Sequence, residues 1–467
     1  MPPGTALDEK LRAEIGKQGQ PQLARDPVNQ ALIRQWCDAM EDQNPAYADA
    51  TFASNSVHGQ IVAPPAMLSV WSRPGNALRP VGPDDPVRTV LVELAAAGYT
   101  SVVATSLAHE YVRYLRLGDV LTATQWVHDV SAEKRTALGA GRFVTTATEY
   151  RAQTGDLVGR ARLDLLAFKA GRGHSTASAG ESASKGARPP RPRPGISRDT
   201  QFFWDGVRAG ELRIQRCARC GELHHPPMVR CPQCGSHELG YQVSSGKGVV
   251  YSFVEPCHPR VAAFDYPYVV GLVELEEGTR LITNLVHIDP DAVAIGMPVE
   301  LVFGQPDPEL TLPLFRPRRP ARRETTLVFD EVNAGDELPP CPIPITARLI
   351  VAGALASRDY DGVHHDRDAA NRSGLPDILM NIFTTGGLCA RYVSDWAGPE
   401  ALLRGLTIRL GTPNHPHDTM TIAGAVCSKG SEGETNLIDI RLRGYNRRGD
   451  HASGSIVVEL PTTARIR

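Results

Sequence analysis

The sequence of 467 residues predicts an α+β protein with two related parts and a small all-β part between them. Two stretches share one order of helix, polar loop and long strands, which is typical of α+β folds. Four cysteines in two closely spaced pairs precede a run of short strands. We expect folded parts at 1–170, 200–316 and 327–467, with linkers at 171–199 and 317–326.

The composition is that of an ordinary globular protein. Hydrophobic residues make up 42%, charged residues 22%, and the net charge is −2. The opening stretch "MPPGTALDEKLRAEIGKQG" lacks the apolar run of a signal peptide. No segment approaches the roughly 18 apolar residues of a membrane span. We therefore expect a cytoplasmic protein that binds neither a membrane nor nucleic acid.

The first linker follows from its composition. The stretch "GRGHSTASAGESASKGARPPRPRPGISRD" is rich in Gly, Ser, Ala, Pro and Arg. Such a segment buries too little apolar surface to offset its ordering entropy, so it is predicted to be a flexible tether.

The two outer parts begin alike. Each starts with a capped segment that suits a helix, "DPVNQALIRQWCDAM" in the first and "IPITARLIVAGALAS" in the second. A polar loop and a second helix-like apolar segment follow in each. Long β-rich runs then come, such as "TSVVATSLAHEYVRYL" and "TNLIDIRLRGY".

The polar loops share an internal repeat with a constant offset of 317 positions. The matched pairs are Asp42 with Asp359, Tyr47 with His364, and Asp49 with Asp366. The second copy, "SRDYDGVHHDRDAA", is open to three interpretations: a metal site, a solvated turn and an acid/base loop. Adjacent histidines point in different directions in a helix or strand, which disfavours a metal site.

The pattern Asp359, His364, Asp366, Ala370 resembles that of the MaoC-like, R-specific enoyl-CoA hydratases. The resemblance implies hot-dog folds, each an antiparallel sheet around one long helix, in both outer parts. It also implies that Asp359 and His364 hold the attacking water. This chain has Asp361-Gly362 where the family usually has Asn-Pro.

The two copies should differ in chemistry. Hydration of an unsaturated thioester needs a base, an acid for the α-carbon and a donor for the enolate oxygen. His and Asp exchange protons near neutral pH, whereas a tyrosine, with a pKa of about 10, is a poor base there. The second copy is therefore predicted to be catalytic, and the first, with Tyr47, a pseudo-hydratase.

For the oxyanion donor, the resemblance implies a backbone N–H at the start of the central helix. We expect that helix to begin within "SGLPDILMNIFTT" and the donor to be the N–H of Asp377. Which of Asp359 and His364 delivers the α-proton stays open. Asp366 is predicted to fix the loop, His365 to be exposed or structural, and His415 and His417 to be turn residues.

The middle part carries a predicted metal site. Two Cys-x-x-Cys pairs separated by ten residues suit a tetrahedral structural zinc ion. The four ligands are Cys217, Cys220, Cys231 and Cys234. A predicted helix, "FFWDGVRAGEL", comes before them and several short strands after them, which suggests a small barrel. This order resembles the OB-fold/zinc-ribbon domains of acyl-CoA enzymes, which implies docking of a thiolase-like partner.

The combination of two MaoC-like parts with an OB-fold/zinc-ribbon part resembles the hydratases of actinobacterial steroid side-chain degradation. Here both subunits would lie in one chain. The resemblance implies a steroid enoyl-CoA substrate, a β-hydroxyacyl-CoA product and a thiolase-like retro-aldolase as partner. We also expect a homo-oligomer. The alternatives are a non-catalytic acyl-CoA scaffold and a hydratase of another bulky acyl-CoA. Nucleic-acid binding is disfavoured because acidic and basic residues nearly balance in 201–303.

Overall fold

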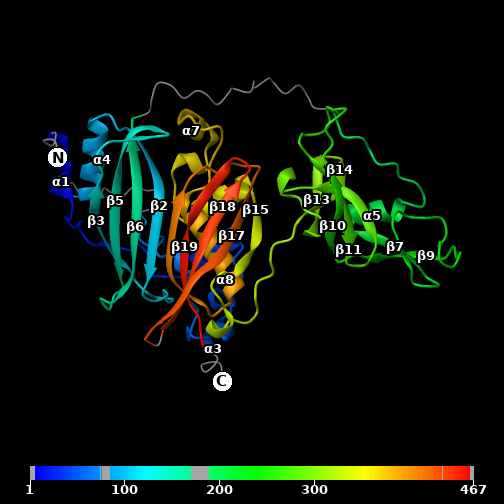
Figure 1. Ribbon diagram of the computed structural model, residues 1–467, viewed down its shortest axis with the longest axis horizontal. Coiled ribbons are helices and arrows are strands. Elements are labelled where there is room, and N and C mark those ends of the chain that lie inside the picture. Colours follow the sequence, from blue (N-terminus) through cyan, green and yellow to red (C-terminus); the bar gives the residue numbers. More distant parts are fainter. Residues whose placement is uncertain (1–5, 74, 76–84, 170–188, 434, 463–467) are drawn as a thin grey trace. The chain divides into compact units, whose positions relative to one another are not determined.

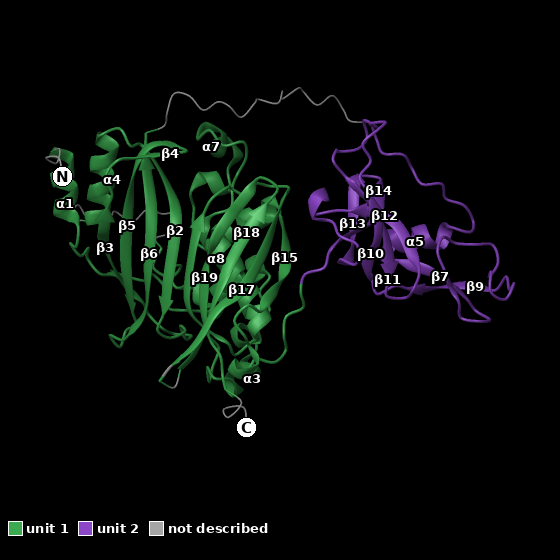
Figure 2. Ribbon diagram, viewed as in Figure 1, with its two compact units in different colours: residues 1–176, 320–467 green, residues 177–319 purple. Residues whose placement is uncertain are grey.

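The chain forms two compact units in a computed structural model that describes residues 6–73, 75, 85–169, 189–433 and 435–462 (Figure 1). Unit 1 contains residues 1–176 and 320–467, and unit 2 contains residues 177–319 (Figure 2). Residues 171–188 of the predicted first linker lie outside the described residues. Among the described helices, none has the length and apolar character needed to cross a lipid bilayer.

The first repeat of unit 1 has short helices followed by long strands. Its elements are α1 (Ala6–Glu14), β1 (Gln22–Leu23), α2 (Gln30–Met40), η1 (Pro45–Tyr47), α3 (Ala50–Asn55), η2 (Pro65–Met67), α4 (Pro86–Ala96), β2 (Ser101–Tyr111), β3 (Thr122–Val130), β4 (Lys134–Thr136), β5 (Gly139–Arg151) and β6 (Leu157–Phe168).

The second repeat likewise has most of its helices between a first strand and a group of long strands. Its elements are η4 (Phe329–Glu331), β15 (Glu337–Ile345), α6 (Ala347–Ala356), η5 (Gly362–His364), α7 (Arg367–Arg372), α8 (Ile382–Ala397), β16 (Leu402–Leu410), β17 (Asp418–Glu432), β18 (Thr435–Asn446) and β19 (Gly449–Glu459).

The offset of 317 positions, predicted from three pairs of polar residues, also separates matching helices of the two repeats. The starts of α2 and α6, of η1 and η5, and of α3 and α7 are each 317 positions apart. The loop-fixing aspartates also match. Asp49 accepts hydrogen bonds from the first N–H groups of α3, and Asp366 does the same for α7. The duplication therefore extends through the helical half of each repeat.

One antiparallel sheet joins the two repeats. Its eleven strands contain the order β1-β3-β5-β6-β2-β16-β19-β18-β17-β15, with β4 paired to β5. The pairing of β2 with β16, with Leu107 opposite Ile408, forms the boundary between the repeats. Both side chains are buried there, so the sheet and its core continue from one repeat to the other.

A single long helix, α8, lies at the centre of this core. Fourteen of its sixteen residues are buried, so the helix is covered on nearly every side. Two glycines allow close packing. A Cβ on Gly387 would lie 2.7 Å from the Trp36 side chain in α2, and one on Gly353 in α6 would lie 2.3 Å from Thr384. The glycines therefore let α2 and α6 approach α8 closely.

The first repeat lacks an equivalent of α8 among its described residues. The position 317 residues before Ile382 is Pro65, which begins only the three-residue helix η2. Turns follow as far as Ser72. The helix-like apolar segment expected between the polar loop and the strands of the first part is α4, an eleven-residue helix with three buried residues, against fourteen in α8.

Unit 2 combines a zinc-ribbon-like sheet with a closed barrel. Its elements are α5 (Gln201–Ala209), β7 (Arg213–Cys217), β8 (Leu223–His224), β9 (Leu239–Val243), β10 (Lys247–Val254), β11 (Val269–Leu275), β12 (Arg280–Leu285), η3 (Pro290–Ala292), β13 (Pro298–Asp307) and β14 (Leu310–Pro317). The barrel order is β10-β11-β12-β14-β13, and β8-β7-β9 form a separate sheet. Phe315, fully buried, packs in the core of this unit. The predicted small barrel is confirmed.

Candidate functional site

Two turns after α6 present the predicted acid/base pair. Asp359 follows the end of α6, where its N–H donates to the Ala354 carbonyl over 2.8 Å. His364 ends η5, which begins after Asp361 caps the Val363 N–H over 3.2 Å. The replacement of Asn-Pro by Asp361-Gly362 therefore keeps a capped turn at this point.

The His364 ring has a defined tautomer. Its Nδ1 lies 2.8 Å from the carbonyl oxygen of Leu379, which only accepts, so Nδ1 carries the proton. In the neutral ring, Nε2 then holds a lone pair. This Nε2 is 3.6 Å from Oδ2 of Asp359, longer than a hydrogen bond, and both side chains are largely buried. A water molecule bridging the two groups suits this separation.

Asn381 links the pair to the central helix. Its Nδ2 donates to Oδ2 of Asp359 over 3.0 Å and to Oγ of Ser357 over 2.9 Å. Its Oδ1 accepts from the N–H of Thr384 over 2.8 Å, and this cap starts α8. Asn381 is only 3% exposed. Its hydrogen bonds place Asp359 beside the N-terminal end of α8, which is the positive end of the helix dipole.

Replacing Asn381 by Ala should lower both activity and stability. Loss of a hydrogen bond to a carboxylate should reduce kcat/KM by about tenfold to a hundredfold. Loss of the helix cap should cost about 1 kcal/mol in the free energy of unfolding. The matched variant Asn381→Ser keeps a capping oxygen but is too short to reach Asp359. It should restore stability without restoring turnover, measured by thermal unfolding and steady-state kinetics. Full activity in either variant would contradict this role of Asn381.

Two residues that contact Asp359, Asn381 and Arg73, were not found from the sequence. Asn381 had a detectable signal, since an Asn directly before an apolar helical run is an N-cap pattern. Arg73, whose Nη2 lies 3.1 Å from Oδ1 of Asp359, had none, because the two are 286 positions apart in the chain.

The central helix begins within the expected stretch, but five residues after Asp377. The helix begins at Ile382, because Asn381 supplies the cap and Asp377 lies five residues earlier. The Asp377 carboxylate instead pairs with Arg367, with 3.0 Å from its Oδ1 to Nε of Arg367. This ion pair and the Ile378 N–H hold its pKa below the ordinary value, against the opposing effect of burial.

The other histidines of the region divide into two kinds. His365 is exposed, as predicted. Among the described hydrogen bonds, its ring has one partner, the Tyr360 carbonyl oxygen at 3.1 Å. His417 lies in a turn. His415, expected in the same turn, is instead buried, with Nδ1 2.9 Å from the Ile378 carbonyl oxygen. It braces the segment that leads into α8.

The corresponding place in the first repeat is closed. Tyr47 is 3% exposed, and burial raises its pKa well above the ordinary value. Burial also raises the pKa of Asp42. Asn44 donates to Oγ of Ser394 in α8 over 3.1 Å, which ties this loop to the central helix. The arrangement offers a neutral phenol and no acid/base pair.

Four cysteines of unit 2 converge as a metal site. Their sulfur atoms all lie within 4.8 Å of one another, with Cys217 and Cys234 3.6 Å apart and Cys220 and Cys231 3.5 Å apart. Tetrahedral zinc with Zn–S bonds of about 2.3 Å needs sulfur atoms about 3.8 Å apart, so the donor set fits. Gly221 and Gly235, at φ 80° and 73°, close the two turns. The predicted structural zinc site is supported, and four thiolates leave no open position for catalysis.

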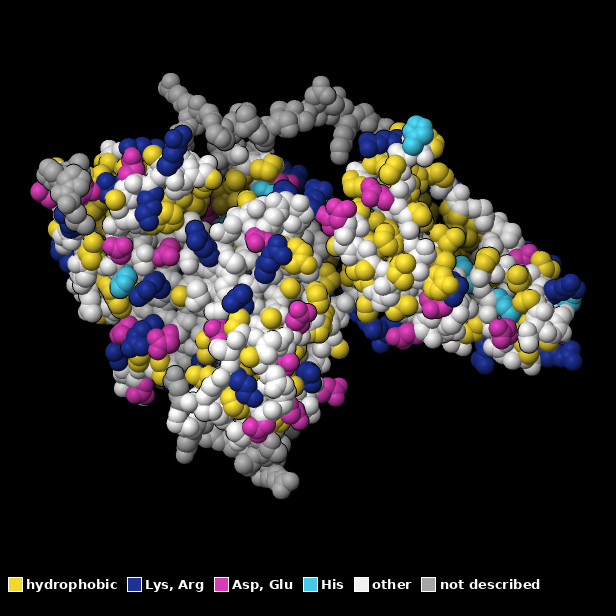
Figure 3. All heavy atoms as spheres, in the orientation of Figure 1, with side chains coloured by type: hydrophobic (Ala, Val, Ile, Leu, Met, Phe, Trp, Pro, Cys, Tyr) yellow, Lys and Arg dark blue, Asp and Glu magenta, His cyan; other side chains and the backbone are white. Residues whose placement is uncertain are grey.

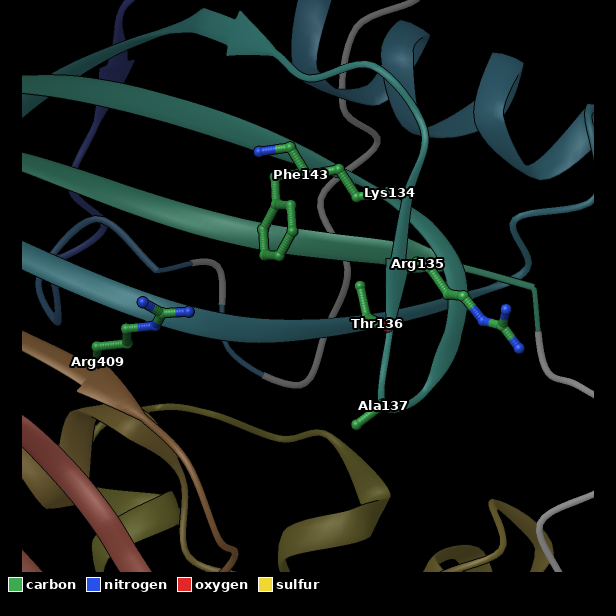
Figure 4. Close-up of a pocket in the computed structure, with 6 residues that line it drawn as sticks. All are labelled: Lys134, Arg135, Thr136, Ala137, Phe143 and Arg409. Atoms are coloured by element: carbon green, nitrogen blue, oxygen red, sulfur yellow. The ribbon is translucent and has the colours of Figure 1, made fainter.

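Unit 1 contains a cavity of about 550 Å³ whose lining does not include the acid/base pair (Figure 4). Lys134, Arg135, Thr136, Ala137, Phe143 and Arg409 line it. Neither Asp359 nor His364 contributes to its lining. We therefore assign it no part in the chemistry of the acid/base pair.

Models of known families match three stretches of the chain. Residues 13–160 match the FAS1-like dehydratase domain region. Residues 204–240 match the rubredoxin-like zinc ribbon domain of ChsH2, and residues 241–304 match the C-terminal OB-fold domain of ChsH2.

Curated relatives agree with these matches. The probable enoyl-CoA hydratase alpha subunit of Thermomonospora curvata is 43% identical over 320 residues, 68% of this chain and 98% of that protein. The 3-oxo-4,17-pregnadiene-20-carboxyl-CoA hydratase alpha subunit of Mycobacterium tuberculosis is 43% identical over 284 residues, 61% of this chain and 88% of that protein. The beta subunit of the same name and organism is 43% identical over 112 residues, 24% of this chain and 84% of that protein.

Among solved structures, a MaoC-like dehydratase covers 97% of this chain and 100% of its own, with a TM-score of 0.52 and 16% identity. The predicted architecture of two hot-dog units, a zinc ribbon and an OB-fold barrel is thus confirmed. Fold and site define a MaoC-like hydratase with an attached zinc ribbon and barrel. More specifically, the chain belongs to the family of enoyl-CoA hydratase alpha subunits with ChsH2-type domains, and it is an enoyl-CoA hydratase.

Proposed function

We propose that the chain adds water to a steroid side-chain enoyl-CoA, giving a β-hydroxyacyl-CoA, with Asp359 and His364 as the catalytic residues. The observation that carries the proposal is the separation of 3.6 Å between Nε2 of His364 and Oδ2 of Asp359 beside the start of α8. A water held between them would face the β-carbon of the bound thioester. The first repeat acts as a pseudo-hydratase, because Tyr47 replaces the histidine.

The oxyanion donor is assigned to the first turn of α8 in place of Asp377. The N–H groups of Ile382 and Phe383 lie in this turn, where a helix offers no internal acceptor. The helix dipole adds to their attraction for negative charge on the thioester oxygen. Because Leu379 and Asn381 contact His364 and Asp359, these donors lie next to the acid/base pair.

A steroid substrate is supported by two observations. A relative 43% identical to this chain carries the name of a 3-oxo-4,17-pregnadiene-20-carboxyl-CoA hydratase. The described part of the first repeat has η2 in place of a second central helix. A three-residue helix supplies fewer side chains to the interior at this place than α8 does, which favours a bulky acyl group.

The decisive experiment is a turnover assay that follows the loss of enoyl-thioester absorbance. A steroid side-chain enoyl-CoA and a short-chain enoyl-CoA are compared with the same zinc-loaded protein. Faster turnover of the steroid ester supports the proposal. Turnover of the short ester alone would refute the steroid assignment, and no turnover of either would refute catalysis by the isolated chain.

We further propose that the barrel of unit 2 docks a thiolase-like retro-aldolase, which would cleave the β-hydroxyacyl-CoA. Hydrophobic side chains gather over the surface of this unit (Figure 3). On the barrel, Val249, Tyr251, Val254 and Ile282 are exposed large hydrophobic residues. Arg280 stacks on Tyr251 at 3.5 Å and lies two positions before Ile282 on the same strand, so these side chains share one face.

Replacing Ile282 by Asp should weaken aldolase binding at least tenfold, since the change puts a charge at the centre of this face. Ile295→Asp is the matched control, because the two isoleucines are 72% and 71% exposed and Ile295 lies outside the strands. Binding is measured by titration with a purified thiolase-like retro-aldolase. Equal affinities of the two variants would place the docking face elsewhere.

A further inference from the structure

Arg73 reaches from the first repeat into the site of the second. Its Nη2 lies 3.1 Å from Oδ1 of Asp359, and its Nε is 3.4 Å from the Arg358 carbonyl oxygen. The guanidinium also lies 4.2 Å from the centre of the Phe383 ring, in the first turn of α8. Three separate contacts therefore fix one cation against the carboxylate.

The place of Arg73 in the repeat explains how it reaches the site. The position 317 residues after it is Ala390, in the middle of α8. In the first repeat η2 ends at Met67, and turns follow as far as Ser72. The chain that would otherwise continue a buried helix is free to direct an arginine toward Asp359.

Among the described contacts, the Asp359 carboxylate has two side-chain donors, Arg73 and Asn381. Oδ1 faces Arg73, and Oδ2 accepts from Asn381 while lying 3.6 Å from Nε2 of His364. An arginine side chain stays protonated in proteins, and a nearby cation favours the ionised form of a carboxyl group.

We propose that Arg73 is a positioning residue that holds the Asp359 side chain in its orientation, so that His364 transfers the proton in hydration. The inference rests on the proposed assignment of Asp359 and His364 as the catalytic pair. It names a role for the first repeat beyond replacing a lost active site. The catalytic pair of the second repeat is complete only when the first repeat supplies its arginine.

The proton and electron balance of this scheme closes. Nε2 of His364 takes one proton from the water while the water oxygen bonds to the β-carbon. The π electrons of the double bond move to the thioester oxygen and form an enolate. The imidazolium, stabilised by the Asp359 carboxylate, returns the proton to the α-carbon, and the C=O bond is restored. Asp359 orients the water by accepting a hydrogen bond from it and exchanges no proton.

The test compares Arg73→Ala and Arg73→Lys with wild type in the full chain. We expect Arg73→Ala to lower kcat about tenfold to a hundredfold with KM within about threefold, because Arg73 acts through Asp359. Added guanidinium chloride, at concentrations well below those that unfold the protein, should recover at least a third of the lost kcat. Arg73→Lys should lie between the two, since it keeps the charge but not the planar fork.

Arg113→Ala is the matched control. Arg113 pairs with Asp119 at 2.7 Å, and the side chains of that pair are 30% and 10% exposed, close to 26% and 16% for Arg73 and Asp359. Its kcat should stay near wild type and should not respond to guanidinium. A general effect of losing a half-buried ion pair would appear equally in both variants and would overturn the proposal.

Other outcomes also decide the question. Wild-type kcat in Arg73→Ala, or a loss that guanidinium leaves unchanged, would refute the positioning role. If Arg73→Ala does not fold, Arg73→Lys carries the test. A kcat of Arg73→Lys equal to wild type would then refute the need for the planar guanidinium group. Failure of the proposed function is distinct, because it would appear as absent turnover in wild type.

Discussion

Replacing His364 by Ala should reduce hydration by about a hundredfold to ten-thousandfold while the fold stays intact. The side chain supplies the only imidazole facing Asp359 among the described contacts, since Nδ1 is held by the Leu379 carbonyl at 2.8 Å and Nε2 faces the carboxylate. The loss should appear mainly in kcat. Thermal unfolding and zinc content should remain close to wild type.

The neighbouring His365 provides an unusually close control. It has the same side chain one position later, but it is exposed and contacts a backbone carbonyl at 3.1 Å. His365→Ala should therefore keep activity within a few-fold of wild type. Equal losses in both variants would indicate a disturbed loop, and full activity of His364→Ala would remove this histidine from the mechanism.

Replacing Cys217 by Ser should remove zinc from unit 2 and unfold the ribbon. A wild-type chain should bind about one zinc ion, and the variant well below half of that, because serine is a poor zinc ligand. Folding of small zinc domains depends on the metal, so the unfolding transition of unit 2 should move to lower temperature. Hydration should persist, since Asp359 and His364 both lie in unit 1.

Cys257→Ser separates zinc binding from general thiol loss. Cys257 is exposed in the same unit and lies outside the four-cysteine cluster. Its zinc content, measured by elemental analysis, should match wild type. Zinc retained in Cys217→Ser would show that this cysteine is not a ligand, and weaker aldolase binding in that variant alone would connect the ribbon to docking.

The architecture was predictable because its signals are local or periodic. The cysteine spacing marks two turns that meet around one ion, and the structure brings those four sulfur atoms within 4.8 Å. The offset of 317 positions exposed the duplication, and the helices follow it. The capping role of Asp366 was also predictable, since Asp before a helical run is a local pattern.

What failed depended on contacts between distant segments or on where a helix starts. Asp377 was placed at the helix start because Pro376 favours a first turn, yet Asn381 forms the actual cap. That η2 has only three residues, where α8 begins in the second repeat, could not be seen, since a short apolar run reads alike whether it is helical or not. Arg73 is brought to Asp359 by tertiary packing alone.

The strand pairing of β2 with β16 has a consequence for assembly. In Mycobacterium tuberculosis, the matching sequences carry the names of separate alpha and beta subunits. Two separate chains that meet at such a boundary must find each other, and dilution separates them. Here the two edges belong to one polypeptide, so their encounter is intramolecular and their ratio is always one to one. Specific activity per chain should therefore be independent of protein concentration as far as this pairing is concerned.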